Sequence, residues 1–184
     1  MAKHAVRTVL EQSGPRFDLC DIQIIAAPDG APEVFVCDAP APCAISISHA
    51  AGVALCEVTE AGHSPGCDIE VVEAGNRTFL ADYFVEEEAS FVESLSPTAR
   101  AVGATLIWSA KESALKSLRE GLRRDTRSVI VRPRWDGPED GWHRFQVECT
   151  ETGRVFFGWW KVEGRLVVTI GSTSAESVPH RLQA

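Results

Sequence analysis

The sequence contains no apolar run that approaches the roughly 20 residues needed to cross a bilayer. Its first seven residues are not followed by the apolar segment and cleavage site of a secretory signal. It also has no repeat, no low-complexity tract and no long linker. We therefore expect a cytoplasmic protein with no membrane partner, whose 184 residues form one compact domain or two small halves that share a core.

Cysteine patterns typical of zinc sites and disulfides are also lacking, although the chain has six cysteines. None belongs to a pair separated by two residues, and several lie in apolar, strand-like runs. Without a secretory signal, such cysteines are more often buried free thiols than disulfides or zinc ligands. We expect free thiols at all six positions, which are Cys20, Cys37, Cys43, Cys56, Cys67 and Cys149.

The overall charge argues against nucleic acid as a partner, because the formal net charge is −8. The distribution is uneven, since eight basic and three acidic residues between Lys111 and Arg134 leave a local excess of +5. A local basic patch can hold phosphates or steer an acidic protein. Taken alone, however, the same pattern is more typical of a solvated helix face followed by a basic loop.

The order of the expected elements predicts an α+β fold. Three helices are expected in the middle of the chain, over residues 76–84, from residue 86 up to Pro97, and from about residue 98 to about residue 119, where Gly121 follows. Strands before and after the helices, separated by turn residues such as Asp136-Gly137-Pro138, favour antiparallel sheets with helices packed on one face. The strands are expected over residues 17–27, 33–37, 43–48, 52–58, 67–70, 128–131, 143–149, 154–161 and 166–170.

Two carboxylates two residues apart form the first candidate site. In an extended segment Asp68 and Glu70 project to the same side, while Ile69 turns toward the core. Paired carboxylate oxygens suit Mg²⁺, which usually completes its shell with water and substrate phosphates. The alternative is that the two acids are simply exposed at the end of a strand. This short pattern alone favours exposed acids over a metal site.

A helical segment carries the second candidate site. Trp108, Glu112, Leu115 and Lys116 share one helix face because positions three and four apart are neighbours. A surface ion pair between Glu112 and Lys116 is the commoner meaning of this spacing. A tryptophan one turn earlier suggests partial burial, where the carboxylate could complete a metal site or act as a base and the lysine could stabilise phosphate charge.

The third candidate is Ser48-His49, at the end of an expected strand. A single histidine is more often structural than functional, but near a phosphate it could donate hydrogen bonds or add charge. None of the three patterns decides the function alone, and their order and spacing together are more informative.

Together the three elements resemble the 4′-phosphopantetheinyl transferase family, particularly its surfactin-synthetase-activating branch. That family carries a Ser-His element, then Gly-x-Asp-x-Glu, then a Trp-Ser-x-Lys-Glu-[Ala/Ser]-x-x-Lys helix. Here they read Ser48-His49, Gly66-Cys67-Asp68-Ile69-Glu70 and residues 108–116, and the last matches at essentially every defining position. The resemblance covers about residues 43–134 well, and the N-terminal forty residues and the tail only loosely.

The resemblance implies transfer of 4′-phosphopantetheine from coenzyme A to a serine of an acyl or peptidyl carrier protein, with release of 3′,5′-ADP. Mg²⁺, or alternatively Mn²⁺, would be held by Asp68, Glu70 and Glu112. The catalytic residues would be Glu112 as base, Lys116 as the group that stabilises the leaving phosphate, and Asp68. Cofactor phosphates would be contacted by Ser48, His49, Lys111 and Lys116.

By the same resemblance, one transferase domain over residues 1–184 would have an N-terminal half of about residues 1–65 and a C-terminal half, about 66–184, with the motifs. Whether the halves form a pseudo-twofold monomer, or subunits share the site, stays open. A carrier's acidic helix would dock near the basic segment 119–127. The family's Gly-Lys-Pro element is matched only by Gly30-Ala31-Pro32, and Arg7 and Arg16 are candidate contacts for the 3′-phosphate.

Two other hypotheses stay open at this point. Three carboxylates and a lysine would also serve a Mg²⁺-dependent hydrolase or transferase acting on another phosphoester. A non-catalytic family member could bind coenzyme A or a carrier protein without turnover.

Overall fold

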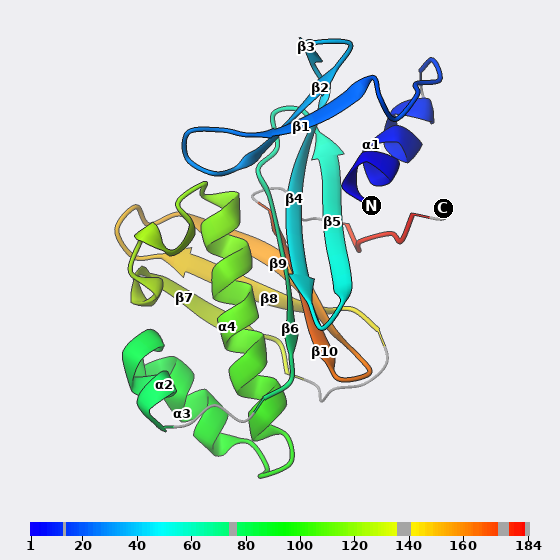
Figure 1. Cartoon of the computed structure of the whole chain (residues 1–184). Coiled ribbons are helices and arrows are strands. Elements are labelled where there is room, and N and C mark those ends of the chain that lie inside the picture. The colour runs from blue at the N-terminus through cyan, green and yellow to red at the C-terminus, as the bar shows by residue number, and fades with distance from the viewer. Residues whose placement is uncertain (13, 74–76, 136–140, 173–176, 183–184) are drawn as a thin grey trace.

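A five-stranded antiparallel sheet and one long helix form the C-terminal part of the molecule (Figure 1). The computed structural model describes residues 1–12, 14–73, 77–135, 141–172 and 177–182. The strands lie in the order β6-β10-β9-β8-β7, so β10, at the end of the chain, separates β6 from the other three. Their bounds are β6 Pro65–Val71, β7 Val129–Pro133, β8 His143–Cys149, β9 Val155–Glu163 and β10 Leu166–Ser172.

Helix α4 (Arg100–Ser117) packs directly on β6 and β10. Small and polar residues allow the close approach. A Cβ atom on Gly66 of β6 would lie 2.0 Å from the Ser113 carbonyl oxygen, so only glycine fits there. The hydroxyls of Ser109 and Ser113 both hydrogen-bond that of Thr169 on β10. Because polar groups buried at this interface are paired with one another, α4 is seated in one rotational position on the sheet.

Two shorter helices, α2 (Arg77–Tyr83) and α3 (Glu86–Ser94), lie beside α4. The main hydrophobic core fills the space between the helices and the sheet. Two 3₁₀ turns, η1 (Gly121–Arg123) and η2 (Thr126–Ser128), connect α4 to β7. The largest buried side chains of this core include Trp160, Phe145, Phe156, Leu106 and Ile107.

The N-terminal part has a separate, smaller hydrophobic cluster. This part of the chain consists of helix α1 (Ala2–Glu11), a three-stranded sheet and a hairpin. The sheet contains β1 (Ile22–Ala26), β2 (Pro32–Val36) and β3 (Ala39–Pro40), and the hairpin contains β4 (Cys43–Ala50) and β5 (Val53–Glu60). Val6 and Ile22 are fully buried in this cluster. Strand β4 also runs alongside β6, where the backbone N–H of Cys67 donates to Ser46 Oγ at 3.0 Å. This contact joins the two parts next to the Asp68 segment.

The α+β architecture with antiparallel sheets agrees with the prediction from the sequence. The three central helices and all nine expected strands are present, with bounds that differ by a few residues. Helix α1 and the short strand β3 were not expected. The predicted cap Asn76 and the turn at residues 136–138 lie outside the described residues, and the division into halves near residue 65 stays a prediction.

The six cysteines are all free thiols. The expectation that they are buried is wrong for Cys20 and Cys37, which are exposed next to the β1–β2 strands. Among the described residues, no helix is long and apolar enough to cross a membrane.

Candidate active site

Three carboxylates from two elements converge at the contact between α4 and β6. Asp68 and Glu70 lie on β6, and Glu112 lies on α4. One oxygen from each lies within 4.8 Å of the others. Alternation along β6 turns both acids toward the same side, and the packing of α4 on that strand brings Glu112 to them. The grouping is that of a divalent-cation site with oxygen ligands.

The carboxylate of Asp68 is almost completely buried, with a side-chain exposure of 2%. Its Oδ1 accepts hydrogen bonds from Ser48 Oγ at 2.8 Å and from Lys116 Nζ at 2.7 Å. Its Oδ2 is buried and has no hydrogen-bond partner among the described residues. A buried carboxylate oxygen without a partner is costly. This oxygen therefore fits the role of a metal ligand, with the opposite oxygen fixed by Ser48 and Lys116.

Glu70 is held by the indole of Trp108, which two other aromatic rings contact. Trp108 Nε1 donates to Glu70 Oε1 at 3.3 Å. The Trp108 ring meets the rings of Phe79 and Tyr83 edge-on, with centroids 5.3 and 5.1 Å apart. Burial, and then the charge of Asp68, raises the pKa of Glu70. A bound cation would relieve this repulsion between carboxylates.

Glu112 and Lys116 lie one turn apart on α4, with 3.9 Å between Oε2 and Nζ. Burial and, secondarily, the charge of Asp68 raise the pKa of Glu112 to about 7. A carboxylate in this range can exchange a proton near neutral pH. Lys116 Nζ also donates to the Cys67 carbonyl oxygen at 3.1 Å, which fixes the ammonium between β6 and the pocket described below.

Lys111 does not fit its expected role as a contact for a cofactor phosphate. Its side chain is fully buried and lies 2.8 Å from Glu88 Oε2 of α3, which is also fully buried. Its ammonium donates in addition to the carbonyl oxygens of Thr126 and Val129. A lysine has three donors, and here all three are used inside the protein. The structure therefore assigns Lys111 to the attachment of α4 to α3, η2 and β7.

Ser48 and His49 have different surroundings although they are adjacent. Ser48 donates a hydrogen bond to Asp68 and so orients a candidate metal ligand. The sequence predicted Ser48 instead as a contact for the cofactor. His49 is exposed near the end of β4. Side chains of consecutive strand residues leave opposite faces, so His49 does not share the direction of Ser48. A contact between His49 and a cofactor phosphate stays a prediction.

A pocket of about 270 Å³ opens beside Lys116. It lies between the C-terminal end of α4 and the N-terminal part of the chain. Lys116 lines this pocket and also donates to Asp68 of the carboxylate cluster, so the pocket and the cluster are adjacent. The other residues that line it include Asp29, Gly30, Ala31, Ile45, Ser46, His63, Ser64, Ser117 and Arg119.

The basic segment 119–127 is largely neutralised by acidic residues of the same chain. Arg119 pairs with Asp29 and Glu33, Arg124 pairs with Glu120 and Glu151, and Arg127 pairs with Asp125. Several of these acids are distant in sequence, so the local charge count could not include them. Arg127 stays half exposed and pairs within its own turn, whereas the side chain of Arg124 is only 17% exposed.

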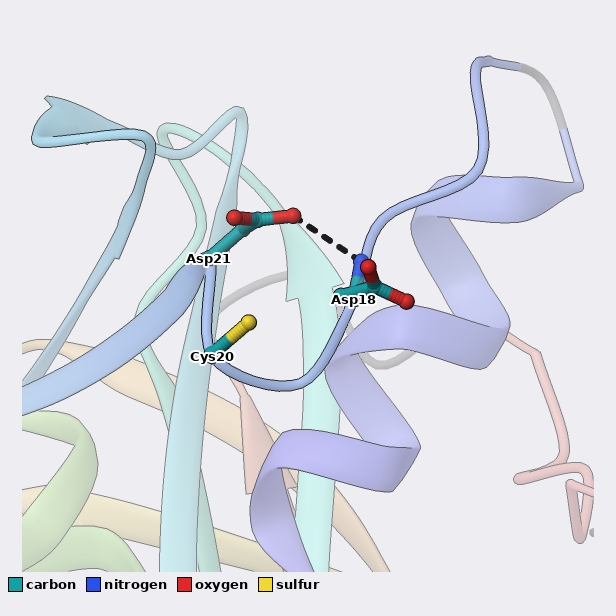
Figure 2. Close-up of side chains that lie close together, drawn as sticks. All are labelled: Asp18, Cys20 and Asp21. Carbon is teal, nitrogen blue, oxygen red and sulfur yellow. Dashed lines mark hydrogen bonds between the residues drawn. The ribbon is translucent and has the colours of Figure 1, made fainter.

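A second group of ligand-type side chains lies between α1 and β1 (Figure 2). It consists of Asp18, Cys20 and Asp21, and the two flanking members are joined by a hydrogen bond of 3.0 Å from the Asp18 backbone N–H to Asp21 Oδ2. Asp18 and Cys20 are exposed. Unlike Asp68, this group contains no buried carboxylate oxygen that lacks a partner, and its hydrogen bond closes a turn.

The comparison with known families gives one match. The family model described as 4′-phosphopantetheinyl transferase superfamily matches residues 64–168, which is more than half of the chain. The matched segment begins just before β6 and ends within β10, so it contains Asp68, Glu70, Glu112 and Lys116 but not Ser48 or His49. No curated protein gives a significant match to the chain.

Proposed function

The chain belongs to the 4′-phosphopantetheinyl transferase superfamily, and on that premise we propose that it transfers 4′-phosphopantetheine from coenzyme A to a serine of an acyl or peptidyl carrier protein. The products would be the holo carrier protein and 3′,5′-ADP. The observation that carries this proposal is the convergence of Asp68, Glu70 and Glu112, with the unpartnered Asp68 Oδ2, beside a lysine and a pocket.

Asp68, Glu70 and Glu112 would hold the divalent cation, Mg²⁺ or Mn²⁺. All three offer the hard oxygen ligands that these ions prefer, and the buried Asp68 Oδ2 has a coordination position to fill. When bound, the ion would supply Lewis-acid stabilisation of the pyrophosphate charge. Ser48 would keep Asp68 in orientation through its 2.8 Å hydrogen bond.

The reaction would form a bond between the carrier serine oxygen and the β-phosphorus, and break the pyrophosphate bond to the nucleotide. The electron pair of the broken bond goes to the departing 3′,5′-ADP, whose charge Lys116 would stabilise. The serine proton would pass to the carboxylate of Glu112, directly or through a water molecule. Glu112 and Lys116 are within 3.9 Å of each other, so both can act on one phosphoryl group.

The pocket beside Lys116 would receive the nucleotide end of coenzyme A. Lys116, which contacts Asp68, lines one side of it and residues 29–32 line another, so the pyrophosphate would lie near Lys116 and the nucleotide farther along the wall. His49 stays a candidate for a phosphate contact.

The carrier protein would approach from the side of α4 and the segment that follows it. Because Arg124 is engaged by two acids and Arg127 by one, Arg127 is a better candidate than Arg124 for a contact with an acidic carrier helix. An exposed cation of this kind changes the rate of encounter more than the affinity of the site for its small substrate.

The proposal is tested by measuring the release of 3′,5′-ADP from coenzyme A with and without an apo carrier protein, in the presence of Mg²⁺. Transfer to a carrier predicts release only when the carrier is present and unmodified. Release without any carrier would instead identify a phosphoester hydrolase. No release with fatty-acid, polyketide or peptidyl carriers would contradict the proposed activity.

A further inference from the structure

Arg119 occupies a backbone position that normally belongs to glycine. It follows the C-terminal cap of α4, Leu118, and its φ is +58°. Two hydrogen bonds complete this helix end, from Arg119 N to the Lys116 carbonyl at 2.9 Å and from Glu120 N to the Leu115 carbonyl at 3.0 Å. Helices commonly end in this way with glycine, because other residues are strained at positive φ. A strained arginine at the edge of a site calls for a functional explanation.

The guanidinium of Arg119 reaches across to the β1–β2 turn, which lies over the C-terminal end of α4 (Figure 1). Nε lies 2.7 Å from Asp29 Oδ2, and Nη2 lies 3.1 Å from Asp29 Oδ1 and 3.0 Å from Glu33 Oε1. The Arg119 side chain is 47% exposed. Ion pairs with this exposure contribute little to folding stability, so stability is a weak reason for keeping an arginine here.

The same residues form part of the pocket wall beside the carboxylate cluster. Asp29 and Arg119 line the pocket together with Lys116. Lys116 reaches inward to Asp68, whereas Arg119 follows the end of the helix and reaches the turn opposite. The pocket wall therefore contains two cations, one that contacts the carboxylate cluster and one that is covered by Asp29 and Glu33.

We propose that Arg119 binds a phosphate at the nucleotide end of the co-substrate, and that Asp29 and Glu33 hold its place until the ligand arrives. This inference rests on the proposed function, from which it takes an adenosine phosphate as the ligand. A guanidinium pairs with carboxylate and phosphate in the same bidentate geometry, so one can replace the other. Binding then includes the cost of displacing Asp29 and Glu33, or of bringing their negative charge close to the phosphate.

A purely structural clamp would make a different prediction. If the three residues only held the β1–β2 turn against α4, removing any one charge would loosen the pocket, and every variant would bind more weakly. If Asp29 and Glu33 are placeholders, their neutralisation strengthens binding and only the loss of Arg119 weakens it. The variant Asp29→Asn suits this comparison, because its side-chain oxygen can still accept the 3.0 Å hydrogen bond from the Ala31 N–H.

The test is calorimetric titration of coenzyme A and of 3′,5′-ADP into five proteins: the unmodified chain, Arg119→Gln, Asp29→Asn/Glu33→Gln, the triple variant, and Arg123→Gln. Arg119→Gln should weaken binding about tenfold, as expected for the loss of a charged hydrogen bond. Asp29→Asn/Glu33→Gln should strengthen binding severalfold, and this gain should vanish in the triple variant. Arg123→Gln is the matched control, since Arg123 contacts the same turn through the Asp29 carbonyl oxygen and not, among the described residues, through a carboxylate; it should change binding less than twofold.

Three outcomes would overturn the inference. Binding by Arg119→Gln equal to that of the unmodified chain would do so, as would weaker binding by Asp29→Asn/Glu33→Gln, which identifies a clamp. In both cases transfer by the unmodified chain would leave the proposed function intact. If the folded, unmodified chain binds neither coenzyme A nor 3′,5′-ADP, the proposed function and this inference fail together.

Discussion

The ammonium of Lys116 lies 2.7 Å from Oδ1 of Asp68, although 48 residues separate the two in the chain. This contact joins the long helix to the strand that carries two of the three clustered carboxylates. It leaves the second Asp68 oxygen buried and without a partner among the described residues. The lysine thus orients one oxygen of the carboxylate while the other is available to a cation.

Replacing Asp68 by asparagine should weaken divalent-cation binding by at least tenfold, because the cluster loses a charge and its buried ligand oxygen. Binding of Mn²⁺ to each variant and to the unmodified chain can be followed by electron paramagnetic resonance. Asp18→Asn, in the exposed cluster of Figure 2, is the matched control and should leave this affinity unchanged. Equal affinity of Asp68→Asn and the unmodified chain would remove the carboxylate cluster as a metal site.

Lys111→Met should destabilise the fold by about 3–5 kcal/mol, because Glu88 would stay buried with an uncompensated charge. Urea unfolding measures the loss. The double variant Lys111→Met/Glu88→Gln should recover part of it, since no charge then remains buried. Lys161→Met, which removes a partly exposed pair with Glu163, is the control and should change stability by less than about 1 kcal/mol. If Lys111→Met also changed the free energy of unfolding by less than about 1 kcal/mol, the buried pair would contribute little to stability.

Glu57 on β5 should make folding stability depend on pH. Burial raises its pKa from 4.5 to about 8, opposed by a hydrogen bond from the Gly66 backbone. The native state therefore holds a proton that the unfolded state has lost between those pH values, and stability should fall as pH rises from about 4.5 to 8. Glu57→Gln should reduce this fall, leaving the smaller contribution of Glu112, whose pKa is also raised, and should stabilise the protein at pH 8 by a few kcal/mol.

The pH dependence can be measured by urea unfolding at several pH values. The exposed Glu60 lies on the same strand, and Glu60→Gln should leave the profile unchanged. A profile of Glu57→Gln parallel to that of the unmodified chain would show that Glu57 is ionised normally.

Arg127→Glu should raise the KM for the carrier protein severalfold while leaving the affinity for coenzyme A unchanged. Arg127 is half exposed and its ion pair is with Asp125 in its own turn, so the charge reversal breaks a local pair. The effect should shrink at high salt, as expected for an exposed charge. Steady-state kinetics with varied carrier concentration would decide, and an unchanged KM at low salt would place the docking surface elsewhere.

Local patterns in the sequence were sufficient for the central part of the fold. The helix expected over about residues 98–119 is α4, and the alternation at Asp68 and Glu70 is that of β6. Helix α1 was not expected, although Val6, Val9 and Leu10 have the three- and four-residue spacing of a helix face. The segment is only ten residues long and half of them are polar, so the pattern is weak, and in the structure Val6 is its buried residue.

The site itself was less predictable where the partners are distant in sequence. The positions of Asp68 and Glu112 follow from local periodicity, but the motif does not reveal that Lys111 faces Glu88 in the core while its neighbour Glu112 faces β6. The same holds for Arg119, whose partners lie about 90 residues earlier. A charge count along the chain predicts an exposed basic patch that includes Arg119. The packing of the N-terminal part against α4 shows instead that Arg119 is paired with Asp29 and Glu33.

Intact-mass spectrometry of an apo acyl carrier protein, incubated with this protein, coenzyme A and Mg²⁺, measures the proposed transfer itself. The carrier should gain the mass of one phosphopantetheine. That gain should be absent with a chelator and reduced at least a hundredfold in rate with Glu112→Gln, which removes both a ligand and the proposed base. An unchanged carrier mass across fatty-acid, polyketide and peptidyl carriers, or full modification by Glu112→Gln, would contradict the proposed function.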